Sequence, residues 1–249
     1  MSGPGTGRGG ALRLVLADLG ELAPRGERAK YWFLLLASLG LQAAFWYLAT
    51  PGPTLLRLAP QDPVTALSSV AWSVVLLLAV PAVLYRALIG RLEWAGLRLG
   101  DWRFGLAAAV PLAVGAAVLM AFASSDPGLA TTYPWPGPWA GRSLATMAIW
   151  LVAYACYYLS FEAFYRGFVL DVATRAASPA AAVWLSVVMA TLVHLGKPVV
   201  EVLAAAPASL LFAVLAVRSR SVLYPALLHL VIGLSLDVAV LARAGHLLN

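Results

Sequence analysis

The amino-acid sequence predicts an all-α polytopic membrane protein, a bundle of about seven to eight transmembrane helices. Two observations support this fold class. Of the 249 residues, 62% are hydrophobic and only 11% are charged, whereas about a quarter of the residues of a soluble domain are charged. The apolar residues also gather in blocks of about 20, the length that an α-helix needs to cross a bilayer. A soluble core cannot bury so much apolar surface, so we expect lipid to solvate the chain.

The expected spans follow one another with turn-rich breaks at 50–53, 124–128 and 133–139. The third break is rich in Trp, Tyr and Pro, which is typical of a loop at the level of the lipid headgroups. Residues 160–178 leave three alternatives open: a continuation of the fourth helix, a second short membrane helix or a cytoplasmic loop. The expected spans cover 31–49, 64–88, 104–123, 143–161, 180–195, 202–217 and 222–241.

These spans divide the chain into three regions. Residues 1–30 form an N-terminal cytoplasmic segment, in which 11–19 is expected to be a surface helix. Residues 31–142 hold the N-terminal membrane helices, and residues 143–249 form a membrane core that contains the polar motifs described below. Because Arg13 and Asp18 interrupt the early apolar stretch, we do not expect a cleaved signal peptide.

The breaks between the expected spans are alternately rich and poor in Lys and Arg residues. They gather before the first span, between the second and third, after the fourth and before the last. Since cytoplasmic loops carry the excess of basic residues, this pattern predicts a multi-pass inner-membrane protein with its N-terminus in the cytoplasm. These loops account for the formal charge of +6, and no nucleic-acid partner is expected. The abundance of Ala, Arg and Leu indicates a bacterial source, and the single Cys156 excludes a disulfide framework.

Ionisable residues inside the apolar blocks are the candidates for function, since each costs about 2.5–3.5 kcal/mol on insertion scales. Glu162 and Arg166 lie four residues apart with the acid first, so a helix places both charges on one face in the favourable order. Such a pair can also be purely structural, because it neutralises both groups and secures a helix end. The pair alone leaves these two interpretations equally open.

The sequence after His194 predicts a helix break. Gly196 and Pro198 flank Lys197, so one helix is expected to end near His194 and the next to begin at Pro198. Glu201 then lies in a first helical turn, where the helix dipole stabilises its carboxylate. An ordinary interfacial turn explains Lys197 and Glu201 but leaves His194 unexplained.

His229 and Asp237 share the last apolar block. A single buried His is more often a satisfied core residue than a catalyst. Two such histidines with a Glu–Arg pair in one small bundle instead predict a polar cavity between helices, with a general base and hydrogen-bond donors inside it.

At these residues the chain resembles the CPBP family of intramembrane proteases, which includes the CAAX prenyl endopeptidases of the Rce1 type and bacteriocin-processing proteins. The family carries E-E-x-x-x-R, then a helix that ends in His, then H-x-x-x-N, each on a membrane helix. Glu162 and Arg166 match the first motif, His194 ends the second, and His229 begins the third. The resemblance covers roughly residues 145–240 and implies a glutamate-type, metal-independent endopeptidase.

Two positions depart from the family pattern. Phe161 stands where the family has the first Glu of its pair, and Gly233 stands where it has Asn. A branch of the family has an aromatic residue before a single Glu and also carries H-x-x-K-P-x-x-E, which this chain matches from His194 to Glu201. We therefore hypothesise that Glu201 replaces the missing carboxylate. A large distance between Glu201 and the other site residues would refute this.

The resemblance implies a role for each matched residue. Glu162 activates a water and then protonates the leaving amine, while Arg166 orients the carboxylate. His194 and His229 donate to the oxyanion, or one of them orients the water. Because Glu162 and His194 must then lie at a similar depth, we favour a fourth helix that continues past 161. The residues expected to line the cavity are Lys197, Glu201 and Asp237.

We expect no cofactor, although two His and one or two Glu also fit a zinc site. The expected partners are a peptide or protein substrate at the membrane and the bilayer itself. Two other functions stay open. One is a catalytically inactive family member that binds or scaffolds a membrane partner, as an immunity-type protein does, and Phe161 and Gly233 favour it. The other is a proton-coupled transporter, but the sequence has no inverted repeat of the kind many carriers show.

Overall fold

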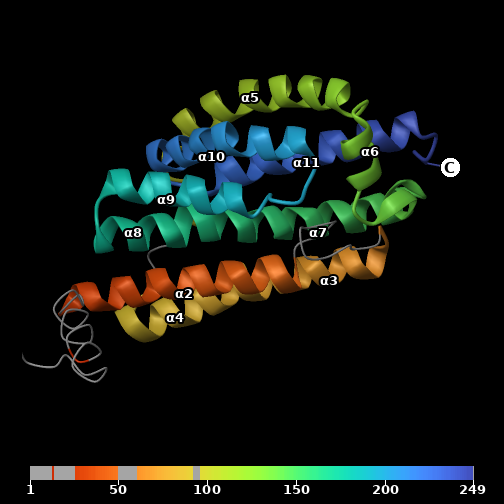
Figure 1. Ribbon diagram of the computed structural model, residues 1–249. Helices are drawn as coiled ribbons and strands as arrows, with labels where there is room; N and C mark the ends of the chain where they lie inside the picture. Colours follow the sequence, from red (N-terminus) through yellow and green to blue (C-terminus); the bar gives the residue numbers. More distant parts are fainter. Residues whose placement is uncertain (1–12, 14–25, 50–60, 92–95, 249) are drawn as a thin grey trace, which may run out of the picture.

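The computed structural model describes residues 13, 26–49, 61–91 and 96–248. In this part of the chain every regular element is helical (Figure 1), which confirms the predicted all-α bundle. The expected surface helix at 11–19 lies outside the described residues except for Arg13.

The described helices occur in the order that the apolar blocks predict. Two of the segments, η1 and η3, are π-helical and continue the α-helices on either side of them, while η2 is a short 3-10 helix. The elements are α2 (Glu27–Leu48), α3 (Pro63–Ser73), η1 (Val74–Ala79), α4 (Val80–Ile89), α5 (Trp102–Ala123), α6 (Pro127–Thr132), η2 (Gly137–Gly141), α7 (Leu144–Glu162), η3 (Ala163–Val169), α8 (Leu170–Ala176), α9 (Pro179–Leu192), α10 (Val199–Ser219) and α11 (Leu223–Arg243).

Within the described residues, 6 helices are long and apolar enough to cross a membrane, and α9 is a shorter apolar helix. The six are α2, α3 to α4, α5, α7 to α8, α10 and α11. Their outer faces expose large apolar side chains, such as Val110, Val114 and Phe122 of α5. Extended apolar surface of this kind is stable against lipid and not against water. The chain is therefore a multi-pass membrane protein.

The fourth membrane helix settles the alternatives for residues 160–178. It runs without a break over 33 residues, Leu144–Ala176, a length of about 50 Å at 1.5 Å per residue. Glu162 therefore lies near the middle of this helix and not at its end. The π-helical segment η3 begins directly after it, and such segments frequently occur at functional sites.

The helix starts around the site follow from local sequence. Ser143 and Thr146 form a reciprocal capping box at the start of α7, which satisfies two backbone donors. The side chain of Ser178 caps α9. As predicted, α9 ends before His194, and α10 begins directly after Pro198. The turn between them contains Gly196 at φ 94°, a conformation that glycine adopts without strain.

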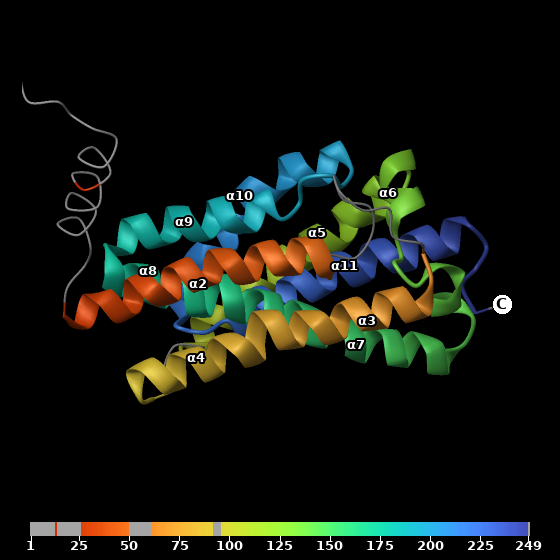
Figure 2. The same cartoon turned by 60° about the horizontal axis from the view of Figure 1, so that its bottom comes forward.

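The long helix α7 to α8 passes through the middle of the bundle (Figure 1). It packs against α2 and α3 on one side and against α9 and α11 on the other, while α5 lies outermost on α10 and α11. The start of α2 and the C-terminus lie at opposite ends of the bundle (Figure 2). Which end faces the cytoplasm stays a prediction.

The segment 133–139 packs into the bundle. Tyr133 and Trp135 are 5% and 3% exposed, and whether the segment lies at the level of the headgroups stays a prediction. Trp135 contacts Trp150, Tyr154 and Tyr157 edge to face, an arrangement that aromatic rings favour. These aromatic partners on α7 are separated from Trp135 in sequence, so the sequence did not predict the contacts.

Candidate active site

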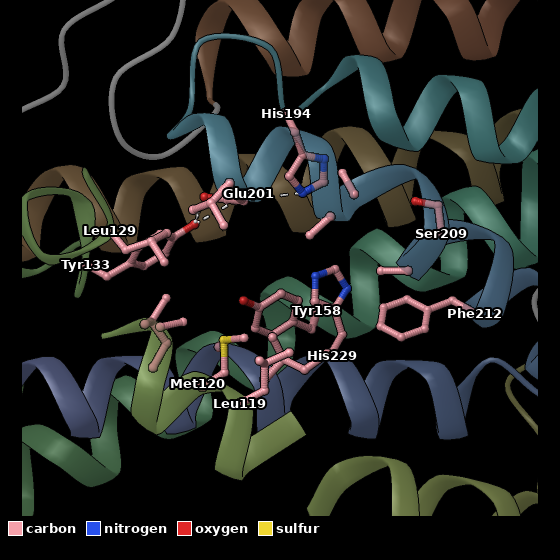
Figure 3. Close-up of a pocket in the computed structure, with 18 of the residues that line it drawn as sticks. Leu119, Met120, Leu129, Tyr133, Tyr158, His194, Glu201, Ser209, Phe212 and His229 are labelled. Carbon is pink, nitrogen blue, oxygen red and sulfur yellow. Dashed lines mark hydrogen bonds and ion pairs between the residues drawn. The ribbon is translucent and has the colours of Figure 1, made fainter. Parts of the chain in front are cut away.

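A cavity of about 220 Å³ lies between α5, α7, α10 and α11. Its walls are mostly apolar, and the polar side chains are few. His194 and Glu201 lie on one side, and His229 and Tyr158 face them from the other (Figure 3). The lining residues are Leu119, Met120, Ala123, Leu129, Tyr133, Tyr158, Phe161, Arg166, His194, Val200, Glu201, Ala204, Ala205, Ala208, Ser209, Phe212, His229, Ile232, Gly233 and Leu236.

His229 is held by Glu162 from behind. The Nδ1 atom of His229 lies 2.7 Å from Oε1 of Glu162, and Glu162 is fully buried outside the cavity lining. An ionised carboxylate only accepts hydrogen bonds, so Nδ1 carries the proton and donates it to this bond. The Nε2 atom of the neutral His229 ring is therefore an acceptor, on the side of the ring away from Glu162.

Arg166 balances the charge of Glu162. Its Nε lies 3.3 Å from Oε2 of the carboxylate, close enough for an ion pair, although the N–H is not aligned for a hydrogen bond. Its Nη2 donates to the backbone oxygen of Ser209 at 3.3 Å. Because both charges are buried, each depends on the other for its stability. The pair thus connects α7 to α10 and holds the carboxylate beside His229.

The ring of His194 has the same tautomer as that of His229. Its Nδ1 lies 2.7 Å from the backbone oxygen of Ala190. A carbonyl oxygen only accepts, so Nδ1 is protonated and Nε2 is the acceptor of the neutral ring. This Nε2 lies 3.8 Å from Oε1 of Glu201. Each histidine of the cavity therefore has one carboxylate nearby: Glu162 is hydrogen-bonded to His229, and Glu201 lies beside His194 without a hydrogen bond to it.

Glu201 is fixed by two donors. The hydroxyl of Tyr133 donates to both carboxylate oxygens at 2.9 Å, and Nζ of Lys197 donates at 2.9 Å. Lys197 also lies 5.3 Å from the ring centre of Trp135, a cation–π distance. Burial, reinforced by the charge of Glu201, raises the pKa of Tyr133 well above its ordinary value, so this phenol stays protonated.

Phe161 packs against both histidines. Its ring centre is 6.1 Å from that of His194 and 5.3 Å from that of His229, edge to face in both cases. The aromatic ring thus occupies the sequence position of the family's first Glu and contacts both imidazoles. Phe212 covers the far side of His229 at 5.1 Å.

Gly233 has no room for a side chain. A Cβ at this position would collide with the hydroxyl of Tyr158 and lie 2.8 Å from that of Tyr154. The space that an Asn at 233 would need is thus filled by Tyr158, whose ring centre lies 4.2 Å from that of His229. The two tyrosine hydroxyls are hydrogen-bonded at 2.8 Å.

The structure brings most of the residues singled out in the sequence to this cavity. His194, Glu201, His229 and Arg166 line it, and Glu162 lies directly behind His229. The hypothesis about Glu201 survives its distance test, because Glu201 lies beside His194 in the same cavity.

Two residues expected to line the cavity are not among those that line it here. Lys197 is bonded to Glu201 but is outside the lining. Asp237 accepts a hydrogen bond from Nε1 of Trp150 at 2.8 Å and is also outside it. Asp237 comes eight residues after His229, which is not a whole number of turns at 3.6 residues per turn, so it faces another direction.

The described residues offer no set of side chains that could bind a zinc ion. Among the described residues, no group of three or more His, Cys, Asp or Glu side chains is placed to hold a metal ion. The two histidines direct their Nδ1 atoms to different partners, Ala190 and Glu162. That the site needs no cofactor stays a prediction.

Comparison with known proteins bears on the same part of the chain. Residues 143–235 match the model of the family described as type II CAAX prenyl endopeptidase Rce1-like. No curated protein and no solved structure matches the chain. The match begins at the cap of α7 and ends within α11, so it contains all three motifs. The match over residues 143–235 agrees with the family resemblance that the motifs predicted.

Proposed function

We propose that this protein is an intramembrane endopeptidase that hydrolyses a peptide bond of a membrane-associated substrate without a metal ion. One observation carries the proposal. Two carboxylates and two histidines, with Glu162 hydrogen-bonded to His229 and Glu201 beside His194, gather at one cavity inside a membrane bundle. Catalytic sites combine a base, a group that orients it and a space for the reacting atoms in this way.

His229 is the general base in this proposal, and Glu162 orients it. The family resemblance implies that Glu162 activates the water, but its carboxylate lies behind the imidazole. Glu162 holds the Nδ1 proton, so Nε2 keeps its lone pair, and the carboxylate stabilises the imidazolium that forms. Arg166 in turn forms the ion pair with the carboxylate of Glu162.

The water lies between the two imidazoles and donates one hydrogen to each Nε2. A water held in this way directs its lone pairs toward the substrate carbonyl. One proton passes to His229 as the oxygen bonds to the carbonyl carbon, which makes the carbonyl oxygen an oxyanion. His229 then returns the proton to the amide nitrogen as the C–N bond breaks. A carboxylic acid and an amine leave the site, and the water is consumed.

In the proposal Glu201 takes the role of the first Glu of the family motif, whose position Phe161 occupies in this chain. Tyr133 and Lys197 hold Glu201 beside His194, while the backbone oxygen of Ala190 fixes the tautomer of this second imidazole. With Lys197 and Arg166 counted, the two carboxylates are balanced by two cations. A neutral site of this kind suits an uncharged peptide backbone.

The inactive binder remains the second candidate, because Glu162 has no direct access to the cavity. Against it, both histidines line the cavity with Nε2 unprotonated. A protein that only binds has no need for two oriented bases in its binding site.

The test uses the full chain in liposomes with a library of peptides that carry an alkyl anchor. Mass spectrometry identifies new peptide termini. We expect cleavage by the wild type, its loss in His229→Gln, and its retention in Asp237→Asn, which changes a buried group outside the cavity. If the wild type binds library peptides but cleaves none, the endopeptidase is overturned in favour of the binder.

A further inference from the structure

The oxyanion of the proposed reaction needs a hydrogen-bond donor, and the histidines do not supply one. In both rings the Nδ1–H group donates its hydrogen bond outside the cavity, to the backbone oxygen of Ala190 in His194 and to Oε1 of Glu162 in His229. Their neutral Nε2 atoms are acceptors. Acyl transfer depends strongly on donors aimed at the developing charge, so the donor must come from another side chain of the lining.

Most other donors of the cavity are already engaged. Tyr133 and Lys197 donate to Glu201. Arg166 has an Nη1 atom without a partner, but its guanidinium lies against the carboxylate of Glu162 and donates to Ser209. The hydroxyls of Tyr158 and Ser209 remain: that of Tyr158 donates to the hydroxyl of Tyr154, a partner that can itself become the donor when the Tyr158 proton turns elsewhere.

We propose that the hydroxyl of Tyr158 donates to the oxyanion of the substrate; this rests on the proposed endopeptidase function. Tyr158 lies on α7 one helical turn before Glu162, and its ring packs against His229 at 4.2 Å. Its hydroxyl points into the cavity (Figure 3). The base and the donor thus lie side by side on one wall, where a single carbonyl group meets both.

Gly233 makes this position of Tyr158 available. Glycine in a helix interior is unfavourable, so its presence usually reflects a close approach. Here the close approach is the Tyr158 hydroxyl, which would collide with any Cβ at 233. In this proposal Tyr158 on α7 supplies the donor that an Asn on α11 would provide. Gly233, where the family pattern has Asn, then contributes to the site by leaving room for the Tyr158 hydroxyl.

Tyr154 is the positioning residue for this donor. Its hydroxyl is hydrogen-bonded to that of Tyr158 at 2.8 Å. When substrate binds, both hydroxyl protons rotate, Tyr154 donates to Tyr158, and Tyr158 donates into the cavity. Hydroxyl rotors adjust to their partners in this way, and a chain of two such bonds strengthens the outer one.

The experiment compares Tyr158→Phe with the wild type on a peptide that the library assay identifies. Loss of one oxyanion donor costs about 10²–10³ in kcat, so we expect that fall with KM changed less than about threefold. Tyr157→Phe is the matched control, because it removes the neighbouring buried hydroxyl on the same helix outside the lining, and it should keep wild-type kcat. Tyr154→Phe should lower kcat by a smaller factor.

A second variant keeps the folded ring and hydroxyl and changes only the donor strength. A fluorinated tyrosine at 158 has a more acidic phenol, so kcat should rise relative to its value with tyrosine, while the same substitution at 157 should have no effect. The Tyr158 proposal is overturned if Tyr158→Phe keeps wild-type kcat, or if Ser209→Ala loses it instead. In those cases the endopeptidase itself stands, whereas a wild type without any cleavage removes both proposals.

Discussion

Glu162 contacts His229 from a position that has no opening to the cavity. The Oε1 atom accepts the Nδ1 proton of His229 at 2.7 Å, while the carboxylate is 0% exposed. The acid therefore determines which nitrogen of the imidazole is protonated, and the imidazole, not the acid, meets the cavity. This geometry distinguishes a residue that orients a base from a residue that is the base.

Replacement of Glu162 by Gln should abolish most activity. The amide cannot fix the Nδ1 tautomer as a carboxylate does, and comparable changes in carboxylate–histidine pairs cost about 10⁴ in kcat. The variant also leaves Arg166 as an uncompensated buried charge, which should lower the free energy of unfolding by about 3–5 kcal/mol. Steady-state cleavage and thermal unfolding in detergent measure the two effects. Wild-type kcat in this variant would contradict the role of Glu162.

The double variant Glu162→Gln with Arg166→Met separates these two effects. With both charges removed, the cost of an unpaired buried ion disappears, so stability should return toward that of the wild type. Activity should not return, because His229 still lacks its carboxylate. If stability and activity recovered together, Glu162 would be only a structural partner of Arg166.

Much of the fold follows from local sequence. The start of α10 follows from Pro198, and the apolar blocks mark the six long spans and the shorter α9. The polar residues at the cavity are also found from sequence, because an ionisable group in a lipid-facing segment needs a reason to be there. Glu162, His194 and His229 stand out on this ground alone.

The aromatic part of the site was not predicted. Tyr133 and Glu201 are 68 residues apart in sequence, and nothing local indicates their contact. Tyr158 lies one helical turn from Glu162. An aromatic residue in a membrane helix is, however, interpreted as a packing residue unless its contacts are known. Tautomers likewise depend on tertiary contacts, so the acceptor role of both Nε2 atoms required the structure.

Gly233→Ala should destabilise the protein although it usually strengthens a helix. The added methyl group meets the hydroxyls of Tyr158 and Tyr154, and such overpacking costs about 1–3 kcal/mol. Gly115→Ala on α5 is the matched control, because a Cβ there meets nothing within 4 Å, and it should leave the unfolding temperature unchanged or raise it. Equal unfolding temperatures for the two variants would contradict the close packing at 233.

The N-terminal end of the bundle should face the cytoplasm, because the basic residues gather at breaks on that side. Single cysteines at Arg28→Cys and His246→Cys, in a Cys156→Ala background, report the two ends. A charged, membrane-impermeant maleimide should label position 246 in intact spheroplasts and position 28 only after lysis. The opposite pattern would reverse the orientation, and labelling of both from outside would contradict the placement of the two ends.

If Glu201 replaces the missing carboxylate, its charge should matter for catalysis as well as for stability. Glu201→Gln should lower kcat by at least about 10²-fold, the smaller end of what an acid–base group contributes. Tyr133→Phe keeps the carboxylate but removes its phenol donor. It should cost about 1.5–3 kcal/mol of stability, as hydrogen bonds to charged groups do, with a smaller change in kcat.

The exposed pair of Glu27 and Lys30 supplies the control for Glu201. Its N···O distance of 2.9 Å equals that between Lys197 and Glu201, but Glu27 is exposed to solvent, where an ion pair contributes about 0–1 kcal/mol. Glu27→Gln should therefore leave both stability and kcat close to those of the wild type. If Glu201→Gln instead lowered only the stability, at unchanged kcat, Glu201 would be a structural partner of Lys197 and the reaction would rest on Glu162 and His229 alone.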